Sequence, residues 1–345
     1  MLDKLDPLVT VIVPTYNVES FIGDCLDSLV NQTYSNLEVI VIDDDSTDGT
    51  VEICRRYQNI FSNIQILIND HNRGVSASRN RGIKYARGEY LSFVDGDDFL
   101  APNFIKSLID KAIEDSSDVV VTGFTFYYPD RIEPHSGSGS SIFPGRDLYA
   151  VANSIMGSET FSISGGMSWN KLFKKELFDY FIFPEDLWAC EDEFLLSQLS
   201  TKVRFCSFLS GSGYYYRRRE GQASEGRGFW LGLLNSRLKF FNYFKSNPDI
   251  FCTERKYYEI AIRIAVASAL VHNIQMLMDQ MDRNHYAKLK RTIREINLNE
   301  LLNCPELKTY LGRTCLIYIR VFYNFRKFPI FTLKAMRKIK RFIRF

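Results

Sequence analysis

Residues 37–50 of the chain read LEVIVIDDDSTDGT. The first six are mostly apolar and rich in β-branched side chains, which predicts a buried strand of a parallel sheet. Three aspartates follow directly at positions 43–45, and Asp48-Gly49-Thr50 then opens a helix that we expect to run through Tyr57. The stretch therefore predicts one strand–turn–helix unit of an α/β protein, with acidic side chains where the strand ends.

The same alternation of strand and helix extends in both directions along the chain. Apolar, β-branched runs predict strands, and apolar residues at helical spacing predict the helices between them. Because parallel strands are joined by right-handed crossovers, this order predicts a doubly wound, mostly parallel, Rossmann-like sheet with helices on both faces. The further strands are predicted at residues 8–13, 64–68, 90–94 and 118–126, and the further helices at residues 18–31 and 76–87.

The second half of the chain follows a different pattern. Residues 129–145, PDRIEPHSGSGSSIFPG, are rich in Pro, Gly and Ser, which predicts a loop. From residue 229 onward the pattern is helical almost without a break. For a chain of 345 residues we therefore expect two parts, an α/β domain over residues 1–225 and a helical C-terminal region over residues 226–345.

The bulk composition argues against several classes of protein. The net charge of +2 does not suit a chain that binds nucleic acid as a polycation. The seven cysteines are scattered without a CxxC pair, which disfavours a disulfide framework or a zinc site and favours reduced cytoplasmic thiols. The first residues, MLDKLDPLVTVIVP, do not resemble a signal peptide, and no apolar run is long enough to predict a transmembrane helix.

Polar clusters follow three of the predicted strands. In an open parallel sheet, ligands bind outside the carboxyl ends of the strands. The first strand is followed by PTYN at residues 14–17, the second by DDDSTD at residues 43–48, and the fourth by DGDD at residues 95–98. Closely spaced aspartates repel one another, and a hard divalent cation, Mg²⁺ or Mn²⁺, bound together with substrate phosphates relieves that repulsion. The alternative is a capped turn, because Asp and Gly also favour turns.

A basic segment, NRGVSASRNRG, lies between the third and fourth strands at residues 72–82. Gly74 permits a tight turn, and Ser76 can cap the helix that follows. Arg73 and Arg79 can face the phosphates or the base of a nucleotide, and for each of them a solvated helix surface is the alternative.

Four stretches together resemble the family 2 glycosyltransferases of the GT-A fold in their order, spacing and strand context. They are VTVIVPTYN (9–17), LEVIVIDDDSTDGT (37–50), NRGVSASRNRGI (72–83) and YLSFVDGDDFL (90–100). The resemblance covers about residues 8–225 and is closest to bacterial enzymes that build capsule, exopolysaccharide or lipopolysaccharide repeat units. One departure is Asp45, where the family usually has glycine.

The resemblance implies a nucleotide-sugar donor, with UDP as the family's usual nucleotide, and a divalent metal, Mn²⁺ or Mg²⁺. Asp44 corresponds to the aspartate that accepts a hydrogen bond from the uracil imide, and Asp97 corresponds to the metal ligand of the DxD motif. The resemblance further implies nucleotide binding by Pro14, Thr15 and Tyr16, a place near the nucleobase for Arg79, ribose or sugar binding by Asp95, and donor-sugar binding by Asp98.

Two further segments resemble the acceptor side of the family's site. Residues 169–173, WNKLF, resemble the segment that lines the acceptor cleft, with Trp169 and Lys171 as its candidates. Residues 191–194, EDEF, resemble the ED motif, which makes Asp192 the general base and Glu191 its neighbour. A carboxylate crowded by other carboxylates can accept a proton near neutral pH. The alternative is a solvated helix surface, where EDE runs are common.

The segment YYYRRREGQAS at residues 214–224 resembles the family's YYxRxxxxS pattern. Arg217 and Arg219 can neutralise the leaving diphosphate, the choice between them is open, and a basic surface patch is the alternative. Only one catalytic carboxylate, Asp192, is matched, since the other matched acids serve the donor and the metal. We therefore expect inverting transfer by direct attack and not double displacement, which needs a nucleophilic carboxylate as well.

The end of the chain is basic. No acidic residue follows Glu306, and residues 326–345 separate apolar from basic side chains at helical spacing. A basic amphipathic helix lies in an anionic membrane surface, which predicts a cytoplasmic protein held peripherally on the inner face of the cell membrane, near a glycan or polyprenyl-linked acceptor. The alternatives are a helix packed on the α/β domain and an RNA-binding tail. The sequence predicts no nucleic-acid partner for the chain as a whole and does not indicate an oligomeric state.

Two other functions fit parts of the pattern. A nucleotidyltransferase also holds a nucleotide and a metal on an α/β sheet, but it usually has a glycine-rich loop after the first strand, and here no glycine occurs before Gly23. A catalytically inactive sugar-binding protein would not need the intact DGDD and CEDE clusters.

Overall fold

The computed structural model describes residues 6–135, 141–145, 148, 167–187, 189–219 and 229–247, and parts of the chain between residues 259 and 302. The chain divides into two compact units, Met1–Leu187 with Glu191–Glu220, and Trp188–Cys190 with Gly221–Phe345. Each unit is described by itself. The predicted boundary at residue 226 lies within residues 220–228, outside the described residues, and stays a prediction.

The first unit contains an eight-stranded sheet in the order β3-β2-β1-β4-β10-β6-β11-β9. The first four strands of that order run parallel, whereas β10 is antiparallel to both of its neighbours. All residues of β1 and β2 are buried, as their apolar sequences predict. The strands are β1 (Val9–Thr15), β2 (Leu37–Asp43), β3 (Ile64–Ile68), β4 (Tyr90–Phe93), β6 (Val119–Thr122), β9 (Ser141–Pro144), β10 (Lys171–Lys174) and β11 (Phe205–Leu209).

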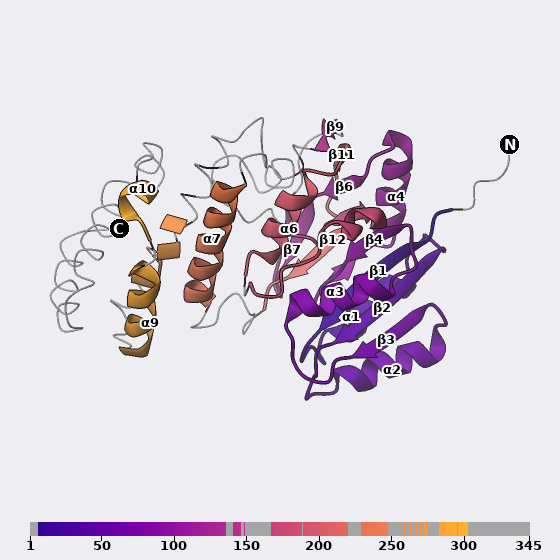
Figure 1. Cartoon of the computed structure of the whole chain (residues 1–345). Coiled ribbons are helices and arrows are strands. Elements are labelled where there is room, and N and C mark those ends of the chain that lie inside the picture. Colours follow the sequence, from indigo (N-terminus) through magenta and orange to yellow (C-terminus); the bar gives the residue numbers. More distant parts are fainter. Residues whose placement is uncertain are drawn as a thin grey trace. The chain divides into compact units, whose positions relative to one another are not determined.

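The sheet reverses its winding direction between β1 and β4. Helices α1 (Ile22–Val30) and α2 (Thr50–Ile60) connect β1, β2 and β3 in one direction, and α3 (Val75–Tyr85) then returns from β3 to β4 on the far side of β1 (Figure 1). With right-handed crossovers, α3 lies on the face opposite α1 and α2. The doubly wound α/β fold is thus confirmed, and its topological switch point, where ligands bind, lies between the ends of β1 and β4.

A second sheet of four strands has the order β5-β12-β7-β8. The strands are β5 (Phe99–Leu100), β7 (Phe124–Tyr127), β8 (Ile132–His135) and β12 (Tyr214–Arg217). Two sequence predictions are wrong here. The strand predicted over residues 118–126 is in fact β6 and β7, which pair in different sheets, and the loop predicted over residues 129–145 contains β8 and β9. Strands β6 and β9 both pair with β11, which lies far along the chain. Strand β8 forms a hairpin with the neighbouring β7, but the Pro, Gly and Ser content of residues 129–145 conceals this short strand from a reading of local composition.

An aromatic cluster fills the first unit beneath the switch point. Phe93 of β4 makes edge-to-face contacts with the rings of Phe173, Phe178 and Phe183, at centroid distances of 6.0, 5.8 and 5.1 Å. All four residues are buried, which fixes the segment that leads from β10 toward the next helix. The remaining helices of this unit are α4 (Phe104–Asp115), the 3-10 helix η3 (Lys175–Asp179) and α6 (Glu191–Leu199).

The described residues of the second unit are mostly helical, as the sequence predicts. They include the helices α7 (Phe229–Ser246), α9 (Arg283–Arg294) and α10 (Leu298–Leu302), and further helical residues occur between residues 259 and 274. Among the residues that the structure describes, none of the helices combines the length and the apolar character needed to cross a membrane. The basic tail, residues 326–345, lies outside the described residues, and its membrane-binding role stays a prediction.

Candidate active site

Asp44, which follows β2, is held by three hydrogen-bond donors. Its Oδ1 accepts hydrogen bonds from Asn69 Nδ2 at 2.7 Å and from the backbone N–H of Arg73 at 2.9 Å, and its Oδ2 accepts one from the Gly74 N–H at 2.7 Å. Gly74 has φ +87°, a conformation that glycine adopts at low cost, so the turn can aim both N–H groups at one carboxylate. The predicted uracil acceptor is therefore fixed in orientation at the edge of the sheet.

The ends of β1 and β2 are tied together beside Asp44. Asn17 donates its backbone N–H to Ser46 Oγ at 2.9 Å, and its side-chain Oδ1 accepts a hydrogen bond from the Thr47 N–H at 2.8 Å. Asp45 has φ +67°, in the left-handed region that favours glycine, which accounts for the glycine usual at this position in the resembling family. Of the predicted nucleotide-binding residues on β1, Pro14 and Thr15 are buried and the Tyr16 side chain is exposed.

The DGDD cluster follows β4, and its second residue has no room for a side chain. A Cβ on Gly96 would lie 2.8 Å from Thr15 Cγ2 and 3.2 Å from the carbonyl oxygen of Pro14, so glycine allows the cluster to approach the end of β1. Asp98 is 1% exposed, and its carboxylate accepts hydrogen bonds from Tyr214 Oη at 2.7 Å and from the Arg217 N–H at 2.8 Å.

The contacts of Asp98 join this cluster to β12. Burial, together with the charges of Asp97 and Asp95, raises the pKa of Asp98 well above its usual range. The hydrogen bonds of Asp98 to Tyr214 and Arg217 tie β12 of the second sheet to the DGDD cluster, and the donor-sugar role predicted for Asp98 stays a prediction.

Asp97, the predicted metal ligand, is paired with an arginine. Its Oδ2 accepts a hydrogen bond from Arg219 Nε at 3.1 Å and forms an ion pair with Arg219 Nη2 at 3.0 Å. Arg217 donates its Nε to the backbone carbonyl of Asp97 at 2.9 Å, while its Nη2 pairs with Asp24 at 2.8 Å. Of the two candidate arginines, Arg219 is thus the one on the carboxylate of Asp97.

The described residues contain no group of three or more His, Cys, Asp and Glu side chains arranged to hold a metal ion. Asp97 by itself offers hard carboxylate oxygens at a site where a cationic group already lies. These residues fit a divalent cation that takes most of its ligands from a substrate diphosphate, as Mg²⁺ does where the protein supplies one or two carboxylates.

A single buried guanidinium joins the DGDD cluster to the EDE segment. Arg79, on α3, is 3% exposed, and its Nη2 pairs with Asp95 Oδ1 at 3.0 Å. Its Nη1 pairs with Glu191 Oε1 at 3.0 Å and with Asp192 Oδ1 at 2.9 Å. The guanidinium also lies over the ring of Phe183, with Cζ 5.2 Å from the centroid. The structure therefore places Arg79 with the predicted base, and not with Asp44; its nucleobase role stays a prediction.

The electrostatics of this cluster are dominated by burial. Burial lowers the pKa of Arg79, but the charges of Asp192, Asp95 and Glu191 raise it by more, so the guanidinium stays charged. Burial and the charge of Asp192 raise the pKa of Glu191 to about 7, although Arg79 opposes the shift. The pKa of Asp95 is also raised, by burial above all. Such displaced carboxyl groups in one cluster are typical of sites that move protons.

The two residues predicted to line the acceptor cleft are both buried. Trp169 is 4% exposed and stacks on Tyr214 at a centroid distance of 4.4 Å and on Tyr216 at 5.3 Å. Lys171 has no exposed surface, and burial lowers its pKa to about 7, although the charge of Asp192 opposes the shift. Both side chains are packed beneath the site, and their contact with an acceptor stays a prediction.

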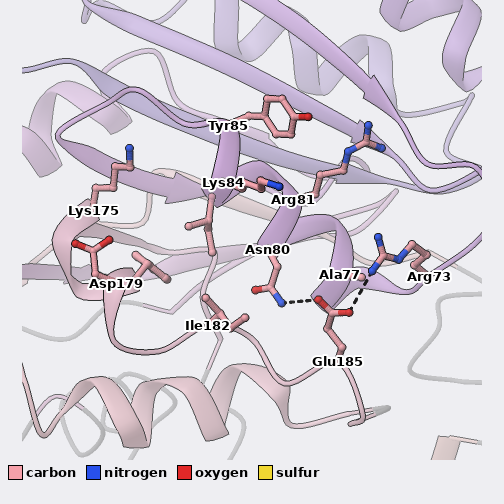
Figure 2. A pocket seen from close by; sticks show the side chains of 12 residues that line it. Arg73, Ala77, Asn80, Arg81, Lys84, Tyr85, Lys175, Asp179, Ile182 and Glu185 are labelled. Atoms are coloured by element: carbon pink, nitrogen blue, oxygen red, sulfur yellow. Dashed lines mark hydrogen bonds and ion pairs between the residues drawn. The ribbon is translucent and has the colours of Figure 1, made fainter.

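A cleft of about 660 Å³ lies along the side of α3, outside this cluster. Figure 2 shows Asn80 reaching Glu185, which also pairs with Arg73 at 3.5 Å. Asn80 further exchanges two hydrogen bonds of 2.9 Å with the backbone of Phe183. None of the carboxylates of the EDE and DGDD clusters lines the cleft. Asn80, which lines this cleft, contributes to the site by fixing the segment that leads to α6.

Sequence reasoning missed several residues that hold the site. Asn69 ends the third strand, so the strand-end argument that found the aspartates also applies to it. Tyr214 lies within a quoted motif, but nothing marked its hydroxyl, which accepts a hydrogen bond from the Asp95 N–H at 3.2 Å. Ser168, whose N–H donates to Asp192 Oδ2 at 3.1 Å, and Asn80 carry no sequence signal of their own.

Comparisons with known proteins identify a family and a fold that the chain shares. A family model described as glycosyl transferase family 2 matches residues 10–181. The glycosyltransferase GlyA of Streptococcus pneumoniae is 34% identical over 236 residues, which cover 64% of this chain and 32% of GlyA. The chain thus spans about a third of the length of that relative.

Two solved structures share the fold. The crystal structure of S. aureus TarS 1-349 in complex with UDP aligns with a TM-score of 0.60 at 20% identity, covering 97% of this chain and 91% of that chain. The mannosyltransferase PcManGT from Pyrobaculum calidifontis, in complex with GDP-Man and Mn²⁺, aligns with a TM-score of 0.52 at 20% identity, covering 94% and 89%. At this level of identity the likeness shows a common fold.

Proposed function

Because the chain belongs to glycosyl transferase family 2, we propose that it is an inverting glycosyltransferase that moves a sugar from a UDP-sugar to a hydroxyl group of an acceptor in cell-surface polysaccharide synthesis. The observation that carries the proposal is the Arg79 guanidinium, which contacts Asp95 of the DGDD cluster and both carboxylates of the EDE segment. The proposed donor-binding carboxylate, Asp95, and the proposed base, Asp192, therefore contact the same guanidinium group.

The nucleotide would bind at the switch point. Asp44, fixed by the N–H groups of Arg73 and Gly74, would accept the hydrogen bond of a uracil imide. The exposed ring of Tyr16 would lie against the base, and Asp95 would take the ribose or the sugar. The UDP in the TarS complex supports a nucleoside diphosphate as the ligand of this fold, and the choice of uracil rests on the resemblance at Asp44.

A divalent ion, Mn²⁺ or Mg²⁺, would be held by Asp97 together with the oxygens of the diphosphate. When bound, it would neutralise charge on the leaving diphosphate. The Mn²⁺ in the PcManGT complex supports metal use by this fold. Arg219, which now neutralises Asp97, would then be free to contact the diphosphate as it leaves, a bidentate role that suits a guanidinium.

Asp192 would act as the general base. Its Oδ1 is held by Arg79 and its Oδ2 by the N–H of Ser168, which leaves each carboxylate oxygen with a further lone pair for an acceptor hydroxyl. The acceptor oxygen would lose its proton to Asp192 as it attacks the anomeric carbon in line with the departing diphosphate. A single displacement of this kind inverts the anomeric centre, so an α-linked donor gives a β-linked product.

The acceptor would be a glycan or a polyprenyl-linked sugar, met at an anionic membrane surface through residues 326–345. This part of the proposal rests on the acid-free, basic composition of the tail. It also rests on the family resemblance, since capsule and exopolysaccharide units are built on membrane carriers. In this proposal, residues 1–225 carry out catalysis, and the helical region from residue 226 contacts the membrane.

A donor panel tests the proposal. We expect UDP-sugars with Mn²⁺ to raise the melting temperature of the protein, because a ligand that binds only the folded state stabilises it. One of these donors should also be hydrolysed slowly to UDP in the absence of acceptor. Binding without any turnover on donor and acceptor panels would favour the inactive sugar-binding protein. Stabilisation by GDP- or dTDP-sugars alone would overturn the assignment of uracil to Asp44.

A further inference from the structure

The short turn formed by residues 167–170 lies between the two carboxylate clusters of the site. It immediately precedes β10, whose first residue is Lys171. The Lys171 side chain has no exposed surface, and its Nζ donates hydrogen bonds to the carbonyl oxygen of Met167 and, at 2.6 Å, to Asn170 Oδ1. Both acceptors belong to the turn, so the ammonium closes the turn on itself.

Asn170 fastens the same turn to the sheet. Its Nδ2 donates to the carbonyl of Thr122, and its own carbonyl accepts the Thr122 N–H at 3.1 Å. Thr122 is the last residue of β6, which pairs with β10. Both the Nδ2 and the Oδ1 of the buried Asn170 amide are therefore hydrogen-bonded. The turn has little freedom to move, because movement would leave these buried polar groups without hydrogen-bond partners.

One end of this turn fixes the proposed base. Ser168, which has no exposed surface, donates its backbone N–H to Asp192 Oδ2 at 3.1 Å. Arg79 holds the other oxygen, Oδ1, at 2.9 Å. The plane of the Asp192 carboxylate is therefore set by two donors, of which one is a backbone group whose position depends on the conformation of the turn.

The next residue of the turn supports the donor side. Trp169 stacks on Tyr214 with an interplanar angle of 23°. The hydroxyl of Tyr214 donates to Asp98 and accepts the N–H of Asp95, so the stack braces the DGDD cluster. Neighbouring residues of a single turn thus contact the proton-accepting and the donor-binding halves of the site.

We propose that Lys171 is a positioning residue for the general base: its buried amino group donates hydrogen bonds that hold the turn of residues 167–170 in the conformation that presents the Ser168 N–H to Asp192. This inference rests on the proposed function, since it takes Asp192 as the base. It differs from the acceptor contact predicted for Lys171, because a side chain without exposed surface acts through the turn and not on the substrate. By the same argument, Ser168 positions Asp192 through its N–H group, and Asn170 positions the turn through its side-chain amide.

The test replaces Lys171 by methionine, which keeps the length of the side chain and removes the ammonium. The matched control is Lys174→Met on the same strand, whose Nζ pairs with Asp118 at 2.8 Å, away from the base. For Lys171→Met we expect kcat for UDP release to fall at least about tenfold, since a misplaced catalytic group costs roughly that much or more. The dissociation constant for UDP should stay within about twofold of the wild type, because Asp44, the proposed uracil acceptor, is held by Asn69, Arg73 and Gly74 and not by the turn. Lys174→Met should keep both quantities within about twofold.

A purely structural role for Lys171 would lower UDP binding and kcat together, and that result would overturn the proposal, as would a Lys171→Met enzyme with normal kcat. If Lys171→Met does not fold, Asn170→Ala, which removes the side-chain acceptor of Lys171, must show the same selective loss of kcat. Asp192→Asn run alongside separates the two claims. Normal turnover in Asp192→Asn would show that Asp192 is not the base. An inactive Asp192→Asn together with a fully active Lys171→Met would contradict only the positioning role of Lys171.

Discussion

Arg219 and Asp97, 122 residues apart in the chain, meet through a single oxygen: Asp97 Oδ2 lies 3.1 Å from Arg219 Nε and 3.0 Å from Nη2. The carboxylate proposed to hold a metal therefore already has a cation beside it. A divalent ion that binds Asp97 must compete with this guanidinium. Binding of the ion and release of Arg219 toward the diphosphate are then two parts of one exchange.

This exchange predicts that Arg219→Met binds Mn²⁺ more tightly than the wild type in the absence of nucleotide, by about fivefold if the lost ion pair contributed roughly 1 kcal/mol at this partly exposed site. Titration of free Mn²⁺ followed by electron paramagnetic resonance measures the effect. The control is Arg218→Met, since the Arg218 guanidinium lies near the rings of Phe126 and Tyr216 and not on Asp97. Equal Mn²⁺ affinity in both variants and the wild type would show that Arg219 does not compete with the metal ion for Asp97.

Removal of Arg79 should destabilise the protein strongly. Its guanidinium is the shared partner of Asp95, Glu191 and Asp192, and Arg79→Met leaves these three carboxylates facing one another in a buried site. Breaking a buried ion pair by removing one partner typically costs about 3–5 kcal/mol. We expect a loss in the free energy of unfolding of that order, measured by urea denaturation. Arg73→Met, whose partner Glu185 is half-exposed at 3.5 Å, should cost less than about 1 kcal/mol. A similar loss in both variants would contradict this account.

Glu191 predicts a defined dependence of stability on pH. Its pKa in the folded protein is raised from the ordinary 4.5 to about 7, mainly by burial. Between these values the folded state binds more protons than the unfolded state, so stability falls as the pH rises through this window. The contribution of Glu191 is therefore fully present below about pH 4.5 and is lost above about pH 7. Its size is at most about 3 kcal/mol.

Denaturation of the wild type and of Glu191→Gln at a series of pH values measures this effect by difference. The free-energy difference between the two proteins should change steadily from about pH 4.5 to about pH 7 and be flat above that range. A difference that does not vary with pH would show that Glu191 titrates at its ordinary value and is not under the influence of burial.

The basic tail predicts salt-sensitive membrane binding. A protein truncated before Arg326 should lose its cosedimentation with vesicles that contain anionic lipid, while UDP release from the donor continues at the wild-type rate. Binding of the full chain should also weaken as salt rises, because ions screen attraction between surface charges. Equal binding with and without residues 326–345 would place any membrane contact elsewhere on the chain.

The parallel half of the sheet was predictable from sequence because the local sequence of its strands is apolar and rich in β-branched residues. Residues 8–13 and 37–42 are mostly apolar, with one polar residue in each run, Thr10 and Glu38, and β1 and β2 are buried throughout. The antiparallel strand β10 was not predictable, since two of its four residues, Lys171 and Lys174, are lysines. Lys171 is buried against Asn170 and the carbonyl of Met167, and the partly exposed Lys174 pairs with Asp118. No local pattern in the sequence reveals such partners.

The candidate site shows the same division. The strand-end clusters were found because their position follows from the parallel sheet. The contacts of Arg79 were not, since Glu191 and Asp192 lie 112 and 113 residues further along the chain. The order of the motifs thus predicted the candidate residues, whereas only the fold shows which of them touch one another. The family match also contradicts the nucleotidyltransferase alternative.

The central claim is that Asp192 accepts the proton of the acceptor hydroxyl, and Asp192→Asn tests it most directly. The substitution keeps the shape of the side chain and removes its basicity, so transfer should fall at least about a hundredfold, in line with the usual contribution of a general base. The dissociation constant for UDP with Mn²⁺, measured by calorimetry on the same sample, should stay within about threefold of the wild type, because the proposed nucleotide contacts are elsewhere. A variant that binds UDP normally and releases it from the donor at a near-normal rate would contradict the account.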